Sequence, residues 1–193
     1  MNVTPTAPDR VLQPYGFSTL AEALDVAARG PTGFNIYSQR GEVAEVLPYA
    51  ILGDQARALA ARFVSAGFVP GDRIALAAVT DGDFLRAFFA CQYAGLVPVP
   101  LPLPAPFGGK EAYVEHVRNM LRSAGARAAI APEDLVEWFQ ESAKGFDLEF
   151  VGTVADLPEA SQINLPTQDP DGLCYIQFSS GSTRFPSGVA VAQ

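Results

Sequence analysis

The sequence predicts an α/β protein with a doubly wound, mostly parallel sheet, helices on both faces and a small amino-terminal hairpin. Three observations lead to this class. Strand-length apolar runs alternate with segments of helical hydrophobic spacing, and the links between them are short. Residues 74–79 form a continuous apolar run, which suits a strand covered on both faces. The hydrophobic content of 49% is enough to bury a core in a chain of 193 residues.

The amino-terminal segments predict a helix, a hairpin and a second helix. A helix over residues 19–29 begins at Ser18, a good N-cap residue, and ends before a Gly-Pro pair. Two β-type runs, 34–37 and 43–47, flank a turn and predict a hairpin. Leucine, alanine and phenylalanine recur at helical spacing over 52–64, and a glycine follows. By domain, we expect residues 1–33 to form an amino-terminal extension and residues 34–193 to form the α/β unit.

The middle of the chain predicts the first strand–helix–strand unit. The apolar strand 74–79 is followed by Thr80, which we expect to cap the next helix while Asp83 reaches back in a capping box. Apolar residues at helical spacing run over 84–94, and a glycine ends them. Residues 97–99 predict a short strand.

The following segments repeat the alternation. Prolines at every second position from Pro98 to Pro106 predict a stiff, extended connector into a helix over 110–124. A strand over 128–131 leads to a helix that begins at Pro132 and continues through residue 139. Short apolar runs at 148–151 and 173–178 predict the last strands before a Ser/Gly-rich loop.

Composition and charge exclude several classes of function. The chain has 13 Lys and Arg against 21 Asp and Glu, a formal net charge of −8, which argues against a nucleic-acid partner. The start lacks the apolar core of a signal peptide, and no apolar stretch reaches the roughly 20 residues that span a bilayer. Cys91 and Cys174 lie in apolar surroundings and predict buried, reduced thiols. We therefore expect a cytoplasmic protein without a transmembrane segment.

The Ser/Gly-rich loop after residue 178 has the chemistry of a phosphate-binding loop. Glycine lets backbone N–H groups approach an anion closely, and hydroxyl groups donate further hydrogen bonds. Composition alone also fits a solvated turn. The loop is not a Walker A motif, because it contains no Gly-Lys-Ser/Thr and leads into the strand-like run 189–191. The sequence gives no metal-ligand set.

The order of residues in this region resembles a known family. Residues 175–189, YIQFSSGSTRFPSGV, are similar to the phosphate loop of adenylate-forming ligases. The segments 71–76 and 90–100 resemble the first third of the same enzymes, and 104–109 resembles their fatty acyl-AMP ligase branch. The resemblance covers roughly residues 34–193 and implies the amino-terminal part of the large domain of such a ligase.

Three positions depart from the usual family pattern. Arg184 stands where glycine is usual, and Ser187 stands where lysine is usual; both resemble the acyl-AMP ligase branch. Gln193 stands where a histidine commonly ends the motif, so hydrogen bonding is kept but proton transfer is lost.

The resemblance implies an activity for the whole enzyme. In it, a fatty acid reacts with Mg²⁺-bound ATP to give an acyl-adenylate, and the acyl group passes to an acyl carrier protein of polyketide or nonribosomal peptide type. Residues of this chain implied to bind the ATP phosphates are Ser179, Ser180, Gly181, Ser182, Thr183, Arg184 and Gly188. The catalytic and metal-binding residues are implied to lie outside this chain, which alone is expected to be inactive. The alternatives are a long-chain acyl-CoA synthetase fragment and a non-catalytic α/β binding domain.

Overall fold

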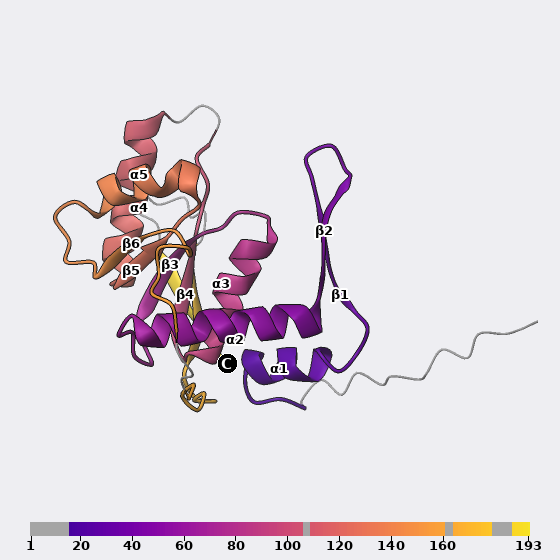
Figure 1. Ribbon diagram of the computed structural model, residues 1–193. Coiled ribbons are helices and arrows are strands. Elements are labelled where there is room, and N and C mark those ends of the chain that lie inside the picture. The colour runs from indigo at the N-terminus through magenta and orange to yellow at the C-terminus, as the bar shows by residue number, and fades with distance from the viewer. Residues whose placement is uncertain (1–15, 106–108, 161–163, 179–186) are drawn as a thin grey trace, which may run out of the picture.

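The computed structural model describes residues 16–105, 109–160, 164–178 and 187–193. Figure 1 shows a central sheet with helices on both sides and the β1–β2 hairpin standing apart from it. The helices are α1 Leu20–Ala27, α2 Tyr49–Ser65, α3 Gly82–Tyr93, α4 Lys110–Ala124 and α5 Glu133–Ala143. The strands are β1 Gly33–Tyr37, β2 Val43–Pro48, β3 Arg73–Ala77, β4 Val97–Leu101, β5 Ala128–Ile130, β6 Phe150–Gly152, β7 Leu173–Phe178 and β8 Gly188–Ala192.

The central sheet is parallel and has the strand order β4-β3-β5-β6. The two faces of β3 belong to different cores, because successive side chains of a strand point to opposite faces. Ile74 and Leu76 pack with residues of α1, α2 and α3. Ala75 and Ala77 pack with residues of α4 and α5. Helices therefore cover both faces, and the predicted doubly wound class is confirmed.

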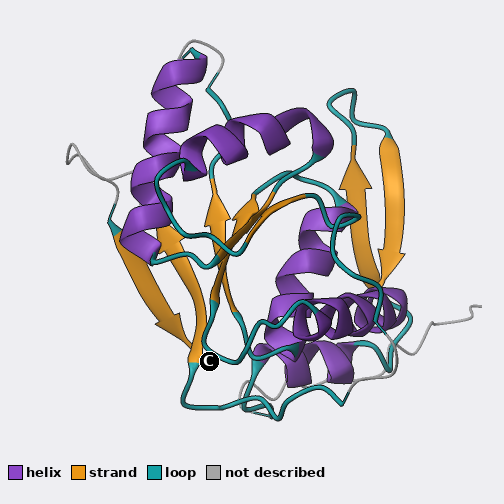
Figure 2. Cartoon of the chain, turned by 60° about the vertical axis from the view of Figure 1, so that its left-hand side comes forward, coloured by secondary structure: helices purple, strands orange, loops and turns teal. Residues whose placement is uncertain are grey.

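The predicted amino-terminal hairpin is also confirmed. Strands β1 and β2 are antiparallel, and Phe34 pairs with Leu47. The hairpin is tied to α3 by an ion pair between Glu45 and Arg86, whose Nε also donates to Gln55 Oε1 at 2.6 Å. Figure 2 shows this hairpin and the β7–β8 hairpin on opposite sides of the central sheet.

Two predicted helix caps were wrong by one residue. Helix α1 is capped by Thr19 and not by Ser18, because the Thr19 hydroxyl accepts from Glu22 N at 3.2 Å. Helix α3 is capped by Asp81 and not by Thr80: the Asp81 carboxylate accepts from Phe84 N at 2.8 Å. A carboxylate or hydroxyl one residue nearer the helix therefore takes the free N–H group in both cases.

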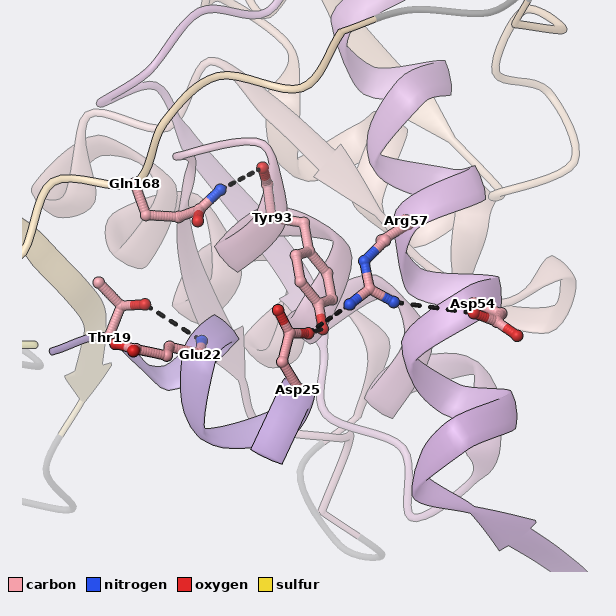
Figure 3. A network of polar contacts seen from close by, with 7 residues as sticks. All are labelled: Thr19, Glu22, Asp25, Asp54, Arg57, Tyr93 and Gln168. Atoms are coloured by element: carbon pink, nitrogen blue, oxygen red, sulfur yellow. Dashed lines mark hydrogen bonds and ion pairs between the residues drawn. The ribbon is translucent and has the colours of Figure 1, made fainter. Parts of the chain in front are cut away.

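Helix α1 packs on the same core as the α/β unit. Its Ala21 and Leu24 are buried against residues of α2 and α3. Figure 3 shows the polar contacts that accompany this packing: Asp25 of α1 accepts from Tyr93 of α3 and pairs with Arg57 of α2. The domain boundary at residue 33 stays a prediction.

In the described part of the chain, no helix is long and apolar enough to cross a membrane. Both thiols are free and buried, as predicted. Burial raises the pKa of Cys91 and also that of Cys174, which is less deeply buried.

Candidate functional site

The two arms of the Ser/Gly loop form an antiparallel hairpin. Strand β7 ends at Phe178 and β8 begins at Gly188, and these two residues pair directly. The loop is therefore held at its neck by strand pairing. The predicted phosphate-binding residues Ser179, Ser180, Gly181, Ser182, Thr183 and Arg184 lie outside the described residues.

Gly188 is the predicted site residue that the structure describes. A Cβ atom there would lie 3.0 Å from Ile176 Cγ2 and 3.3 Å from Phe178 Cε1. Both neighbours belong to the opposite arm of the hairpin, and Ile176 is buried in the core. The absence of a side chain at Gly188 thus lets the two arms approach closely at the neck of the loop.

The loop leaves the hairpin at the carboxyl edge of the central sheet. Strand β7 contacts β4, and the residues preceding both strands line one small cavity, which also includes Gly71 before β3. The amino ends of β3, β4 and β7 therefore lie together, and β7 runs toward the edge where β3 and β4 end. In open α/β sheets, ligands bind outside this edge.

A larger cavity, of about 580 Å³, opens at the same edge. It lies where the chain leaves β3 toward α3 on one face and leaves β5 toward α5 on the other. This is the topological switch point at which α/β proteins commonly bind ligands. Most of its lining is apolar and comes from the ends of three strands and the starts of two helices: Leu76, Ala77, Val79, Phe84, Ala87, Ile130, Ala131, Pro132, Val136, Val154 and Ala155.

Four carboxylates and Thr153 complete the lining of this cavity. Asp81 caps α3, Asp83 pairs with Arg86 at 3.1 Å, and Glu133 begins α5. Asp156 accepts from the backbone N–H and then the hydroxyl of Thr153, both at 2.8 Å, and these bonds lower its pKa. A cavity with this rim repels phosphate groups, so it is a poor site for a triphosphate. Its apolar walls suit an uncharged or cationic group.

Among the described ranges, no group of three or more His, Cys, Asp or Glu side chains is placed to hold a metal ion. The four carboxylates of the large cavity therefore do not form a Mg²⁺ site.

Sequence reasoning missed a buried polar contact at the base of the hairpin. Gln92 is 2% exposed and donates from Nε2 to Cys174 O at 2.6 Å. Gln193 donates to Gln92 Oε1 at 3.1 Å. The signal in the sequence was a lone glutamine within the apolar run AFFACQYAG, which predicts a buried amide with partners. Large-cavity residues gave no comparable signal, because they come from three separate segments, 76–87, 130–136 and 153–156.

Known proteins are similar to this chain over most of its length. The AMP-binding enzyme family matches residues 27–193. A "putative acyl-CoA synthetase" of Caulobacter vibrioides is 54% identical over 189 residues, which cover 98% of this chain and 33% of that protein. The medium-chain-fatty-acid–[acyl-carrier-protein] ligase JamA of Moorena producens is 31% identical over 183 residues, covering 90% and 30%.

A solved structure from work on fatty acyl-adenylate ligases of E. coli and L. pneumophila is also similar. It matches with a TM-score of 0.83 and 36% identity, covering 92% of this chain and 32% of that one. The chain thus spans about a third of the length of the relatives that it matches. The family match extends over most of the chain, through α2, the parallel sheet and both arms of the Ser/Gly loop. On this basis the chain belongs to the AMP-binding enzyme family.

Proposed function

We propose that this chain is the amino-terminal part of the large domain of a fatty acyl-AMP ligase. The observation that carries the proposal is the Ser/Gly loop, held by paired strands at the carboxyl edge of a parallel sheet in a member of this family. Relatives named as fatty acid–AMP and acyl-carrier-protein ligases support the fatty acid as substrate. The enzyme is proposed to act in the cytoplasm.

In the proposed reaction, a fatty acid carboxylate oxygen attacks the α-phosphorus of ATP. The bond from that phosphorus to the bridging oxygen breaks, and pyrophosphate leaves with the acyl-adenylate remaining. Charge develops on the transferring and leaving phosphates, so fixed hydrogen-bond donors accelerate the step. Ser179, Ser180, Gly181, Ser182 and Thr183 are proposed to hold the β- and γ-phosphates.

Two further residues complete the proposed phosphate site. Arg184 assists with a charged, forked donor. Gly188 keeps the neck of the loop narrow, because a side chain there would meet Ile176 and Phe178. Mg²⁺ accompanies ATP and neutralises phosphate charge, and its protein ligands are proposed to lie outside this chain.

The acyl group is then proposed to pass to the phosphopantetheine thiol of an acyl carrier protein, releasing AMP. A second acceptor is coenzyme A, since the relative with 54% identity is described as an acyl-CoA synthetase. Offering the acyl-adenylate to coenzyme A and to a phosphopantetheinylated carrier protein separates the two acceptors. If only the carrier protein is acylated, the carrier protein is supported as the acceptor. If only coenzyme A is acylated, the carrier protein is overturned as the acceptor.

The first test is the reading frame beyond codon 193. A frame that continues into an acidic metal-binding motif and a lysine-bearing carboxyl-terminal domain supports the ligase. A stop codon favours the alternative of a non-catalytic α/β binding domain.

The second test is fatty-acid-dependent exchange of pyrophosphate into ATP by the full-length product. Ser182→Ala removes one proposed phosphate donor, and we expect exchange to fall by about 10²-fold. An unchanged rate contradicts the assignment of Ser182. The 193-residue chain assayed alone is expected to give no acyl-adenylate, and a positive result would contradict the proposed division of the active site.

A further inference from the structure

The β7–β8 hairpin lies against the central sheet without joining its hydrogen-bond ladder. In the described strands, β7 pairs with β8, and the neighbour of β4 in its ladder is β3. The reason lies in the sequence of β4. Val97 N donates to Asp72 O at 2.8 Å, and Leu101 O accepts from Ala78 N at 2.9 Å. The backbone N–H and C=O groups of the odd-numbered residues of β4 therefore point toward β3.

The backbone groups of the even-numbered residues of β4 point to the opposite side, toward β7. These residues are Pro98 and Pro100, and proline has no N–H group to donate. The edge of β4 that meets β7 therefore lacks the donors that a ladder requires. The carbonyl groups of Pro98 and Pro100 can still accept hydrogen bonds, but a ladder with donors on both strands cannot form, so other groups add to the contact between the hairpin and the sheet.

Gln92 supplies a replacement donor from the end of α3. Its Nε2 donates to the backbone carbonyl of Cys174, at the start of β7, at 2.6 Å. Its Oε1 accepts from Gln193 Nε2 at 3.1 Å and faces the Cys174 thiol, with Sγ 3.7 Å away. One buried amide thus bonds both arms of the hairpin, because Gln193 directly follows β8.

Gln193 extends the contact to the amino-terminal helix. Its Oε1 accepts from Leu20 N, in the first turn of α1, at 2.9 Å, and its backbone N–H donates to Gly172 O at 3.3 Å. A cavity of about 220 Å³ opens beside this contact, and Gln92, Leu173 and Gln193 are among its lining residues. The base of the hairpin thus combines these hydrogen bonds with an unfilled space beside them.

We propose that Gln92 and Gln193 are positioning residues for the phosphate-binding loop, acting through the two strands that carry it. This inference rests on the proposed function and names two residues that act on the same site. The pair, called the amide latch below, fixes the hairpin against α3 and α1 in place of the missing ladder. Two linked amides, of which Gln92 is buried, are suited to this task, because each oxygen and nitrogen has a partner in one alignment and loses it in others. Gln193 thereby has a positional role where the family commonly has a histidine.

The test compares three variants of this chain by hydrogen exchange of backbone amides. Gln92→Met keeps the length of the side chain but removes both hydrogen bonds, and Gln193→Met is a milder variant at a less buried site. Phe63→Leu is the matched control, because Phe63 is fully buried on α2 and belongs to the other core. Relative to β3, we expect exchange in 173–178 and 188–192 to become about tenfold faster in Gln92→Met and faster by a smaller factor in Gln193→Met.

The double variant measures whether the two amides act as a unit. If they do, Gln92→Met combined with Gln193→Met is little worse than Gln92→Met alone. Additive effects, or hairpin exchange that rises no more than exchange in β3, would overturn the latch. The Phe63→Leu control is expected to change exchange in the hairpin and in β3 together.

An enzymatic readout then connects the latch to ATP. In the full-length ligase, Gln92→Met is expected to raise the KM for ATP about fivefold and leave the KM for the fatty acid unchanged. Equal changes in both constants would contradict a role in positioning the phosphate loop. If the unsubstituted enzyme makes no acyl-adenylate, the proposed function fails. The hydrogen-exchange experiment still decides whether the amide latch holds the hairpin.

Discussion

Asp25 accepts from two side chains that come from different helices. The Tyr93 hydroxyl donates to its carboxylate, and Arg57 forms an ion pair with the same oxygen and lies 4.5 Å over the Tyr93 ring (Figure 3). Arg57 also pairs with Asp54 at 3.7 Å, but the Asp54 side chain is 81% exposed. Burial, followed by the bond to Asp25, raises the pKa of Tyr93. Asp25 therefore contributes more to stability than Asp54 does.

Replacing Asp25 should cost more than replacing Asp54. Asp25→Ala leaves the Tyr93 hydroxyl without its acceptor, and we expect the free energy of unfolding to fall by about 1–2 kcal/mol. Asp54→Ala breaks an exposed pair and should cost less than about 0.5 kcal/mol. Urea unfolding followed by circular dichroism gives both values. Equal losses would show that the contacts of Asp25 add nothing to helix docking.

Tyr113 gives a prediction for alkaline pH. Its hydroxyl donates to Pro102 O at 3.0 Å, and burial raises the pKa of Tyr113 from 10.0 to about 12. The folded chain keeps this proton when the unfolded chain has lost it, so the stabilisation is complete below pH 10 and is lost as the pH rises toward 12. Tyr113→Phe should therefore flatten the fall in unfolding free energy between these values.

The matched control for Tyr113 is Tyr37, whose side chain lies exposed on the hairpin. Tyr37→Phe should leave the alkaline slope unchanged. A slope that changes equally in both variants would contradict the assignment to Tyr113. Urea titrations at several pH values between 9 and 12 provide the measurement.

At the level of elements, apolar spacing predicts where a helix lies, but the local backbone geometry decides which residue caps it. Apolar spacing located α1 and α3, and Gly125 ends α4 in the left-handed conformation that glycine favours. The caps depended on which of two neighbouring polar residues points back at the first turn. For α3, Thr80 and Asp81 both suit an N-cap, and the Asp83 carboxylate pairs with Arg86 in place of reaching back.

Cap assignment at α3 is directly testable. Asp81→Ala removes the acceptor for Phe84 N, and we expect unfolding free energy to fall by about 1 kcal/mol. Thr80→Ala changes an exposed residue outside the helix and should cost less than about 0.5 kcal/mol. Thermal unfolding of both variants decides between the two caps. A larger loss for Thr80→Ala would restore the capping box that the sequence suggests.

Much of the parallel sheet could be predicted because each strand is a short apolar run between helical patterns. The break between β4 and β7 could not, although Pro98 and Pro100 were visible. Their effect depends on which edge of β4 they face, and only the pairing of β4 with β3 decides that. Of the candidate site, the sequence predicted the loop, but not the amide latch or the acidic cavity, whose residues are distant along the chain.

For the whole molecule, the two thiols lie on parts of the fold that are attached differently. Cys91 is on α3 in the core shared with α1 and α2, and it is fully buried. Cys174 is on β7, a strand outside the main ladder, and is 5% exposed. Exposure of Cys91 requires α3 to leave the sheet, whereas exposure of Cys174 requires only the hairpin to move.

This difference predicts unequal thiol reactivity. With a disulfide reagent such as Ellman's at pH 8, Cys174 should react at least about tenfold faster than Cys91 in the folded protein. Both should react at once in denaturant. Cys174→Ala should leave only the slow phase, and Cys91→Ala should leave only the faster one. A single rate for both thiols would mean that the chain opens as one unit.

The separation of the β7–β8 hairpin from the ladder also has a consequence for the order of folding. Its strands are neighbours in sequence and pair only with each other among the described strands, so this pairing closes a short loop. The hairpin can then attach to the sheet through side-chain contacts, without forming a full hydrogen-bond ladder with β4. The two arms of the Ser/Gly loop can therefore pair early in folding, and the formed hairpin can dock on the sheet later.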